Sequence, residues 1–177
     1  MKEELFFMIN IILRQGYLGK LIWHLGSDIH HQDYRAKLNW FDSFIANLQV
    51  DTAANQIVCG DFNIVCDPID SWRGESANDD IFHTADERNK MTQIFNTGLL
   101  DLFREQSPDE QTFTWWDYRA GAFHRNIGYR IDHILGSKSV LDGCTSFTID
   151  KETRHKSWCQ KEPRTSDHAP VRVELSL

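Results

Sequence analysis

The sequence predicts an α/β protein organised around β-sheet. Two segments carry helical periodicity, and one strongly apolar strand lies between them. After the second helix come four segments with the composition of strands, at residues 112–116, 130–136, 144–149 and 169–175. A helix, a strand, a second helix and then several strands are typical of a layered protein in which helices cover a sheet.

The first helix is predicted over residues 34–48, "YRAKLNWFDSFIANL". Its apolar residues recur at helical spacing and form one stripe: Leu38, Phe41, Ile45 and Leu48. The segment that follows, "QIVCGDFNIV" at residues 56–65, is apolar up to Gly60 and predicts a buried strand that enters a loop. We expect Cys59 inside this run to be a buried thiol.

The second helix begins at a recognisable signal. Thr84 is followed three residues later by Glu87, which matches a capping box. Met91, Ile94 and Phe95 are predicted to face the core, and Gly98 marks the end of the helix.

The segment before this helix, residues 67–83, is acidic and irregular and predicts a surface loop. His83 at its end is predicted to lie at the surface, as are His30 and His31 ahead of the first helix.

Bulk composition sets broad limits on function. A chain of 177 residues is predicted to form one domain, and the net charge of −7 argues against a general binder of polyanions. The same charge is compatible with a metal-dependent enzyme that acts on phosphates, because a bound cation reverses the local field. The four cysteines form no CxxC pair, which favours a reducing cytoplasm.

The N-terminal segment, residues 1–26, carries no targeting signal. Glu3 and Glu4 make its start acidic, and no small-residue cleavage site follows the apolar run. The run is also far shorter than the roughly 20 apolar residues of a membrane span. We therefore predict a helix or strand packed on the core and no contact with a membrane.

Several polar residues occupy strand ends or strand interiors. They are Asp61, Asn63, Asp132, Asp167 and His168. An Asp after Gly is usually a turn residue, because Asp bonds to its own backbone. Asp132 is different, since it interrupts the apolar strand "RIDHILG", where a buried carboxylate requires a partner. A histidine is the natural partner.

These residue types together suit hydrolysis of a phosphate ester. An Asp that holds a His in one tautomer recurs at catalytic imidazoles. Asp61 would then deprotonate a water, Asn63 would donate a hydrogen bond to the developing oxyanion, and Asp167 would offer an oxygen to Mg²⁺. The alternative is an α/β domain without this activity, in which the aspartates are scattered turn residues.

The segment "TFTWWDYRAGAFHRNIGYRID" interleaves aromatic residues with Arg119, Arg125 and Arg130. Such a surface stacks on sugars or bases while its cations meet phosphates. The alternative is that Phe113 and Trp115 are core residues of a strand.

Three motifs, "GDFNI", "TFTWWDYRAGAFHRNIGYRIDHIL" and "SDHAPV", resemble in order and spacing the C-terminal part of exodeoxyribonuclease III. This is the bacterial branch of the apurinic/apyrimidinic endonuclease group, within the endonuclease/exonuclease/phosphatase superfamily. The resemblance covers residues 26–177, whereas residues 1–25 do not match. It implies a four-layered sandwich of two β-sheets flanked by helices. It also implies Mg²⁺- or Mn²⁺-dependent cleavage of double-stranded DNA 5′ to abasic sites, with 3′-to-5′ exonuclease and 3′-phosphatase activities.

The resemblance also assigns roles to residues of this chain. Asp61 resembles the base that activates water and Asn63 the group that stabilises the transition state. Asp132 resembles the carboxylate that orients His168 towards the scissile phosphate. The expected metal-binding residues are Asp61, Asn63, Asp167 and His168.

DNA contacts are expected from the aromatic segment. The residues concerned are Trp115, Tyr118, Arg119, Tyr129 and Ile131. Among them Trp115, Tyr129 and Ile131 resemble the walls of a pocket that takes an extruded abasic sugar.

The sequence departs from the family pattern near its start. The family's metal-binding Asn, its Gln-Glu motif and its active-site Tyr segment are not found, so we expect a chain truncated at its N-terminus, lacking part of the first sheet. We expect weakened metal binding, inactivity of the chain alone, and a monomer with an uncovered apolar sheet face as a surface for self-association. The alternatives are a phosphatase or phosphodiesterase acting on small or lipid phosphate esters, and a non-catalytic remnant.

Overall fold

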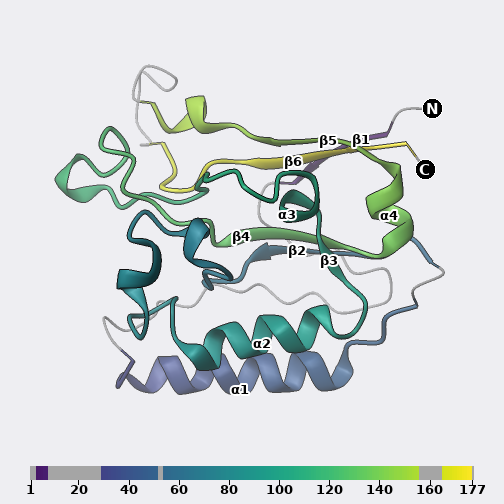
Figure 1. The fold of residues 1–177 in the computed structure, drawn as a ribbon, viewed down its shortest axis with the longest axis horizontal. Helices are drawn as coiled ribbons and strands as arrows, with labels where there is room; N and C mark the ends of the chain where they lie inside the picture. The colour runs from purple at the N-terminus through teal and green to yellow at the C-terminus, as the bar shows by residue number, and fades with distance from the viewer. Residues whose placement is uncertain (1–2, 8–28, 52–53, 156–164, 177) are drawn as a thin grey trace.

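Two antiparallel three-stranded sheets pack against each other, and a pair of helices covers the free face of one sheet (Figure 1). The computed structural model describes residues 3–7, 29–51, 54–155 and 165–176. Within those residues the order of layers is helices, sheet and sheet. This mixed helix and strand architecture confirms the predicted fold class.

The first sheet has the strand order β2-β4-β3, with β2 at Ile57–Asp61, β4 at Asp132–Gly136 and β3 at Leu100–Asp101. The second sheet has the order β1-β6-β5, formed by β1 at Glu3–Phe7, β6 at Val171–Leu175 and β5 at Cys144–Ile149. All neighbouring strands are antiparallel.

Alternation along β2 and β4 explains how the layers are held together. Val58 pairs with Leu135 and belongs to the core beneath the helices. The next pair, Cys59 with Ile134, belongs to the core between the two sheets. Because successive side chains of a strand point to opposite faces, one nearly apolar strand supplies both cores.

The covering helices are α1 at Gln32–Asn47 and α2 at Ala85–Phe95. They pack side by side below the first sheet in Figure 1, with Phe41 from α1 and Met91 and Ile94 from α2 in its core. The capping box of Thr84 and Glu87 is confirmed, since each side chain accepts from the other residue's backbone. None of the described helices is long and apolar enough to cross a membrane.

Short helices interrupt the remaining connections. They are α3 at Leu102–Gln106, α4 at Lys138–Gly143, and the 3₁₀ helices η1 at Pro68–Asp70, η2 at Gly74–Ala77, η3 at Arg119–Gly121 and η4 at Lys151–Arg154. The loops at the left of Figure 1 gather where β2 ends and β4 begins. This end of the molecule carries the candidate site.

Two sequence-based predictions about local structure are wrong. Residues 112–116 form no strand, because their hydrogen bonds are divided between two loops: Trp115 forms isolated bridges with Tyr129 and with His168. His83 is buried rather than exposed, since its Nε2 lies 3.0 Å from Ser71 Oγ and its Nδ1 lies 2.9 Å from Ile81 O. The loop before α2 folds back onto the protein and encloses the ring.

The N-terminal prediction is tested only in part. Strand β1 pairs with β6, as expected for a packed N-terminal element. Residues 8–28 and Cys159 lie outside the described residues. The boundary between residues 25 and 26 stays a prediction.

Candidate active site

Strand pairing brings Asp61 and Asp132 to the same place. Asp61 is the last residue of β2, and it stands opposite Asp132, the first residue of β4. Residues directly opposite each other in an antiparallel pair have neighbouring side chains. Two carboxylates that are 71 positions apart in sequence (132 minus 61) therefore meet at one end of the paired strands β2 and β4.

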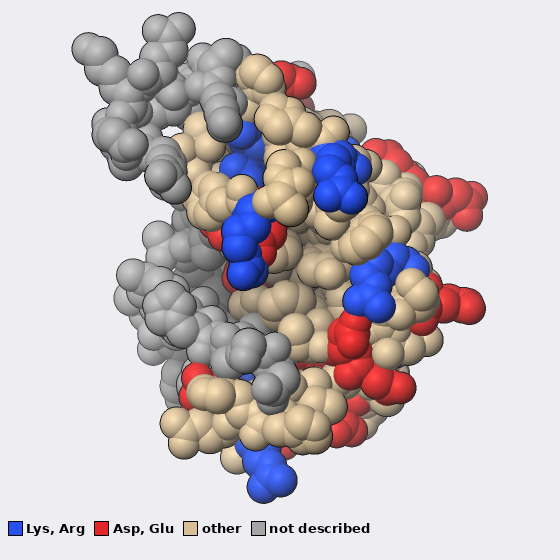
Figure 2. Space-filling view, turned by 90° about the vertical axis from the view of Figure 1, so that its left-hand side faces the viewer, with Lys and Arg blue, Asp and Glu red and all other residues tan. Residues whose placement is uncertain are grey.

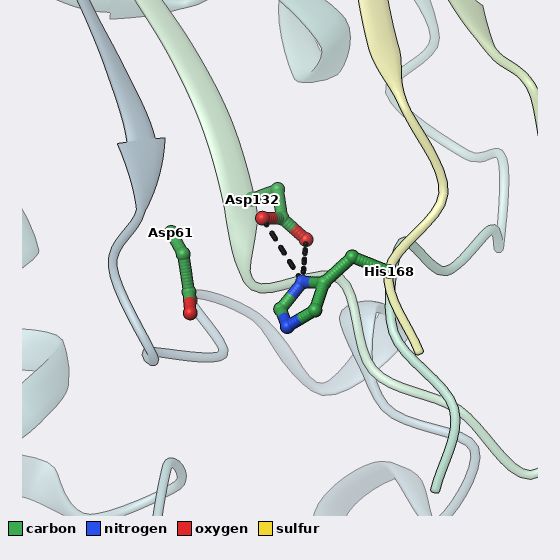
Figure 3. Close-up of side chains that lie close together, drawn as sticks. All are labelled: Asp61, Asp132 and His168. Atoms are coloured by element: carbon green, nitrogen blue, oxygen red, sulfur yellow. Dashed lines mark hydrogen bonds and ion pairs between the residues drawn. The ribbon is translucent and has the colours of Figure 1, made fainter. Parts of the chain in front are cut away.

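His168 completes this group from the loop that precedes β6. Its Nδ1 lies 2.9 Å from Asp132 Oδ2 and 3.2 Å from Oδ1. Dashed lines mark both contacts in Figure 3. The bridge between Trp115 and His168 holds the backbone of this loop in place. An Nδ1–H that donates to the carboxylate leaves Nε2, which faces away from Asp132, for a reacting group.

Burial and charge set the protonation of the imidazole. Burial disfavours the imidazolium, but the hydrogen bond and charge of Asp132, aided by the charges of Asp61 and Asp167, raise the pKa of His168 to about 9. At neutral pH the ring is therefore protonated, and both of its nitrogens carry a proton.

Asp61 is held in a different electrostatic balance. Burial and the charge of Asp132 raise its pKa to about 6, while His168, the bond from the Asn63 backbone and Lys37 act in the opposite direction. The Asp61 carboxyl is thus ionised at neutral pH and remains an unusually basic carboxylate.

Asn63 binds Asp61 through both of its nitrogens. The Asn63 backbone N donates to Oδ1 at 2.8 Å, and its Nδ2 donates to Oδ2 at 2.9 Å. The Asn63 φ of 52° lies in the left-handed region, which Asn tolerates better than most residues. In this structure Asn63 orients the carboxylate, and its role as a donor to an oxyanion stays a prediction.

Asp167 lies next to His168 in sequence but makes a different contact. Trp115 Nε1 donates to Asp167 Oδ2 at 3.1 Å, and the Trp116 backbone N donates to Asp167 O. The cluster that the described residues bring together consists of Asp61, Asp132 and His168, whose ligand atoms all lie within 4.8 Å of one another. Asp132 joins this cluster as the predicted partner of His168, and the assignment of Asp167 as a metal-binding residue stays a prediction.

The cluster fits a metal ion by its chemistry. Two carboxylates within reach of each other suit a hard divalent cation, which binds oxygen ligands. One ring nitrogen of His168 is already bonded to Asp132, so the two carboxylates are the better ligands here.

Aromatic rings form a stack beside this cluster. Trp115 and Tyr129 lie nearly parallel, with ring centroids 5.6 Å apart, and Phe82 contacts both rings edge-on. The sequence identified Trp115 and Tyr129 but missed Phe82, which lies in the loop predicted to be exposed. Ile131, the third predicted pocket residue, is buried with 1% of its side chain exposed.

The predicted cations separate into two kinds. Arg119 is exposed and pairs with Asp117. Arg130 is fully buried, and its guanidinium bonds to Asp70 and Asp101, so the expectation that it meets phosphate is wrong. The alternation of aromatic residues and arginines in this segment does not predict that Asp70 and Asp101 bind Arg130.

The surface at this end of the molecule is hollowed and mixed in charge. Figure 2 shows Lys and Arg side chains at several places around a hollow lined largely by uncharged residues. Tyr118 is exposed and its hydroxyl donates to Thr165 O at 2.7 Å. Trp72, which sequence reasoning passed over, is 44% exposed, and its backbone N donates to Gly128 O beside the aromatic stack.

Comparison with known proteins gives a consistent result. Residues 13–168 match the model of the Endonuclease/Exonuclease/phosphatase family. The chain is 31% identical over 147 residues to "Exodeoxyribonuclease" of Bacillus subtilis, which covers 82% of this chain and 54% of that protein. It is 30% identical over 162 residues to "Exodeoxyribonuclease III" of Haemophilus influenzae, which covers 84% of this chain and 57% of that protein.

Solved structures show the same likeness. An AP endonuclease from Archaeoglobus fulgidus and the 3′-5′ exonuclease NExo from Neisseria meningitidis each have a TM-score of 0.76 and 29% identity. Each match covers 86% of this chain and 58% of the solved chain. The chain spans about half the length of the two bacterial relatives.

Proposed function

The chain belongs to the endonuclease/exonuclease/phosphatase family, and from this premise we propose that it is a DNA-repair nuclease of the exodeoxyribonuclease III type. The reaction is metal-dependent hydrolysis of DNA phosphodiesters 5′ to abasic sites and from 3′ ends. The observation that carries the proposal is the contact of His168 with Asp132 beside the carboxylate of Asp61. These groups can act on one phosphorus atom.

His168 acts as the donor to the phosphate. Asp132 holds its Nδ1–H, so the protonated Nε2 donates to a non-bridging phosphate oxygen. That oxygen gains negative charge as the nucleophile adds. A fixed donor aimed at developing charge in a partly buried site lowers the barrier more than the same donor in water.

Asp61 acts as the base. Its carboxylate, with a pKa of about 6, takes a proton from a water as the water oxygen forms a bond to phosphorus. The bond from phosphorus to the 3′ oxygen breaks, and that oxygen takes a proton from a solvent water and leaves as a hydroxyl, while Asp61 returns its proton to solvent. The products are a 3′-hydroxyl and a 5′-phosphate.

A divalent cation, Mg²⁺ or Mn²⁺, is the proposed cofactor. When bound, it supplies positive charge that stabilises the phosphate oxygens. Asp61 and Asp132 would be its carboxylate ligands, and Asn63, Asp167 and His168 are the further residues predicted to bind it. Asn63 also keeps the Asp61 carboxylate oriented for proton transfer.

Double-stranded DNA is the proposed substrate. The names of curated relatives include a DNA repair nuclease and a DNA-(apurinic or apyrimidinic site) endonuclease, and one solved relative is bound to a product DNA hairpin. In this chain Trp115 and Tyr129 offer stacked rings beside the cluster. Tyr118 and Arg119 lie exposed on the same aromatic segment, and Ile131 backs it from the core.

The proposed working form is a cytoplasmic monomer. All three groups of the cluster come from one chain. No disulfide joins the described cysteines, Cys59, Cys66 and Cys144, which favours a reducing compartment. Sedimentation at rising concentration tests the monomer against self-association through a sheet face.

A substrate panel tests the function. The protein is incubated with duplex DNA containing one abasic site, nicked duplex with a 3′-phosphate and a small aryl phosphate, each with Mg²⁺ and with EDTA. The proposed function predicts Mg²⁺-dependent cleavage of both DNA substrates and a far slower reaction of the aryl phosphate, and this result would overturn the expected inactivity of the chain alone. A preference for the aryl phosphate supports the small-ester phosphatase, and no reaction with any substrate supports the non-catalytic remnant.

A further inference from the structure

Lys37 is the least expected charge in the protein. It lies on the buried face of α1, and its side chain is 1% exposed. The sequence pattern does not predict this burial, because a lysine in an amphipathic helix is normally on the solvated face. Its ammonium group transfers no proton in the mechanism above, although its charge acts to lower the pKa of Asp61.

Three separate segments meet at this ammonium. Lys37 Nζ donates to the backbone carbonyl of Asn63 at 2.6 Å and to Glu87 Oε1 at 2.5 Å. It also lies 5.5 Å from the centroid of the Phe82 ring, within the range of a cation–π contact. The turn after β2, the loop before α2 and α2 itself are therefore tied to one atom.

Glu87 does not need this lysine to complete its cap. Its Oε2 already accepts from the backbone N and the hydroxyl of Thr84, and its Oε1 accepts from the backbone N of Phe82 at 3.3 Å. Buried ion pairs contribute little net stability, because removing two charges from water offsets their attraction. A counter-ion role for Lys37 therefore explains little of its placement.

The bond to Asn63 is the informative one. The carbonyl that receives it belongs to the residue whose backbone N and side-chain N both hold the Asp61 carboxylate. The φ of Asn63 is positive, so this turn depends on its surroundings to stay in place. Movement of Asn63 would move Asp61.

We propose that Lys37 is a positioning residue, which fixes the Asn63 turn and so the Asp61 carboxylate, and joins this turn to Phe82 of the aromatic stack. The inference rests on the proposed function for its catalytic consequence. A shift of the reacting groups by about 1 Å from a distant change costs on the order of 100-fold in rate. The loss should therefore appear in the rate of cleavage rather than in DNA affinity.

Three variants separate positioning from charge balance. Lys37→Met removes the donor and leaves the buried Glu87 carboxylate without its ion-pair partner. Lys37→Met with Glu87→Gln removes the donor and both charges of this ion pair, and Lys37→Arg keeps a donor. We expect both variants that contain Lys37→Met to cleave abasic duplex about 10- to 100-fold more slowly in single turnover. We expect their DNA affinity to change less than about threefold, the double variant to regain thermal stability but not rate, and Lys37→Arg to recover part of the rate.

Hydrogen–deuterium exchange supplies a readout that is independent of activity. In the double variant the peptide covering residues 61–66 should exchange faster than in the wild type, while the β4 peptide is unchanged. The positioning role is overturned if the double variant cleaves at the wild-type rate or if residues 61–66 exchange as in the wild type. If the wild type cleaves no DNA but this exchange accelerates, the proposed function fails and the positioning role stands.

Discussion

At the scale of single residues, protonation at the site depends on which groups face each other. His168 is cationic because Asp132 binds it directly and two further carboxylates lie nearby. The identity of this pair could be predicted, since a carboxylate inside an apolar strand needs a partner. The Arg130 network could not, because Asp70 ends η1 and Asp101 ends β3, and the approach of these two elements to Arg130 depends on the whole fold.

The His168 pair makes stability depend on pH. The folded pKa of about 9 lies above the unfolded value of about 6.5, so this stabilisation is complete below pH 6.5 and is lost as pH rises through 9. In EDTA, we expect the free energy of unfolding to fall by about 2 kcal/mol more in the wild type than in Asp132→Asn between pH 6.5 and 10. Urea unfolding measures both slopes, and equal slopes would show that Asp132 does not hold the charged ring.

Trp72 yields a prediction about DNA binding. Its exposed indole lies on a backbone fixed to Gly128, next to the aromatic stack. Stacking of a base on an aromatic side chain contributes about 1–3 kcal/mol. In a His168→Ala background that prevents cleavage, we expect Trp72→Ala to weaken DNA binding about 10-fold by fluorescence anisotropy, and Trp72→Phe to retain most of the affinity. Equal affinity of all three proteins would exclude this contact.

At the scale of elements, local patterns predicted regular structure better than loops. Helices α1 and α2 follow from apolar periodicity and a capping box, because these signals lie within a few residues. Residues 112–116 have strand composition yet bond to two loops, one of them more than fifty positions further along the chain. Phe82 and His83 were missed for the same reason, since their burial depends on how a loop folds back.

A substitution at Gly128 tests how tightly the aromatic segment is packed. A Cβ at this position would lie 2.5 Å from Trp116 Nε1 and 2.8 Å from Trp115 O. We expect Gly128→Ala to destabilise the protein by about 2–3 kcal/mol in urea unfolding, because a buried indole and backbone must move. Gly121 is the matched control: it has a φ of 63° and no atom within 4 Å of its Cβ position, so Gly121→Ala should cost about 1 kcal/mol. Equal costs would mean that the Trp116 packing is loose.

At the scale of the whole molecule, the site exists only because the layers are assembled. Strand β2 presents Asp61 and β4 presents Asp132, while the loop before β6 in the second sheet brings His168 to them. Packing of one sheet on the other thus fixes the distance between the base and the imidazole. The helical layer adds Lys37, whose Nζ donates to the backbone carbonyl of Asn63.

The most direct test of this account is a double-mutant cycle on single-turnover cleavage of a duplex with one abasic site. Groups that act together on one phosphorus have strongly non-additive effects. We predict that Asp61→Asn and His168→Ala each lower the rate by about 1,000-fold or more, and that the double variant is little slower than either. Multiplicative losses, or a His168→Ala variant as fast as the wild type, would contradict a shared site.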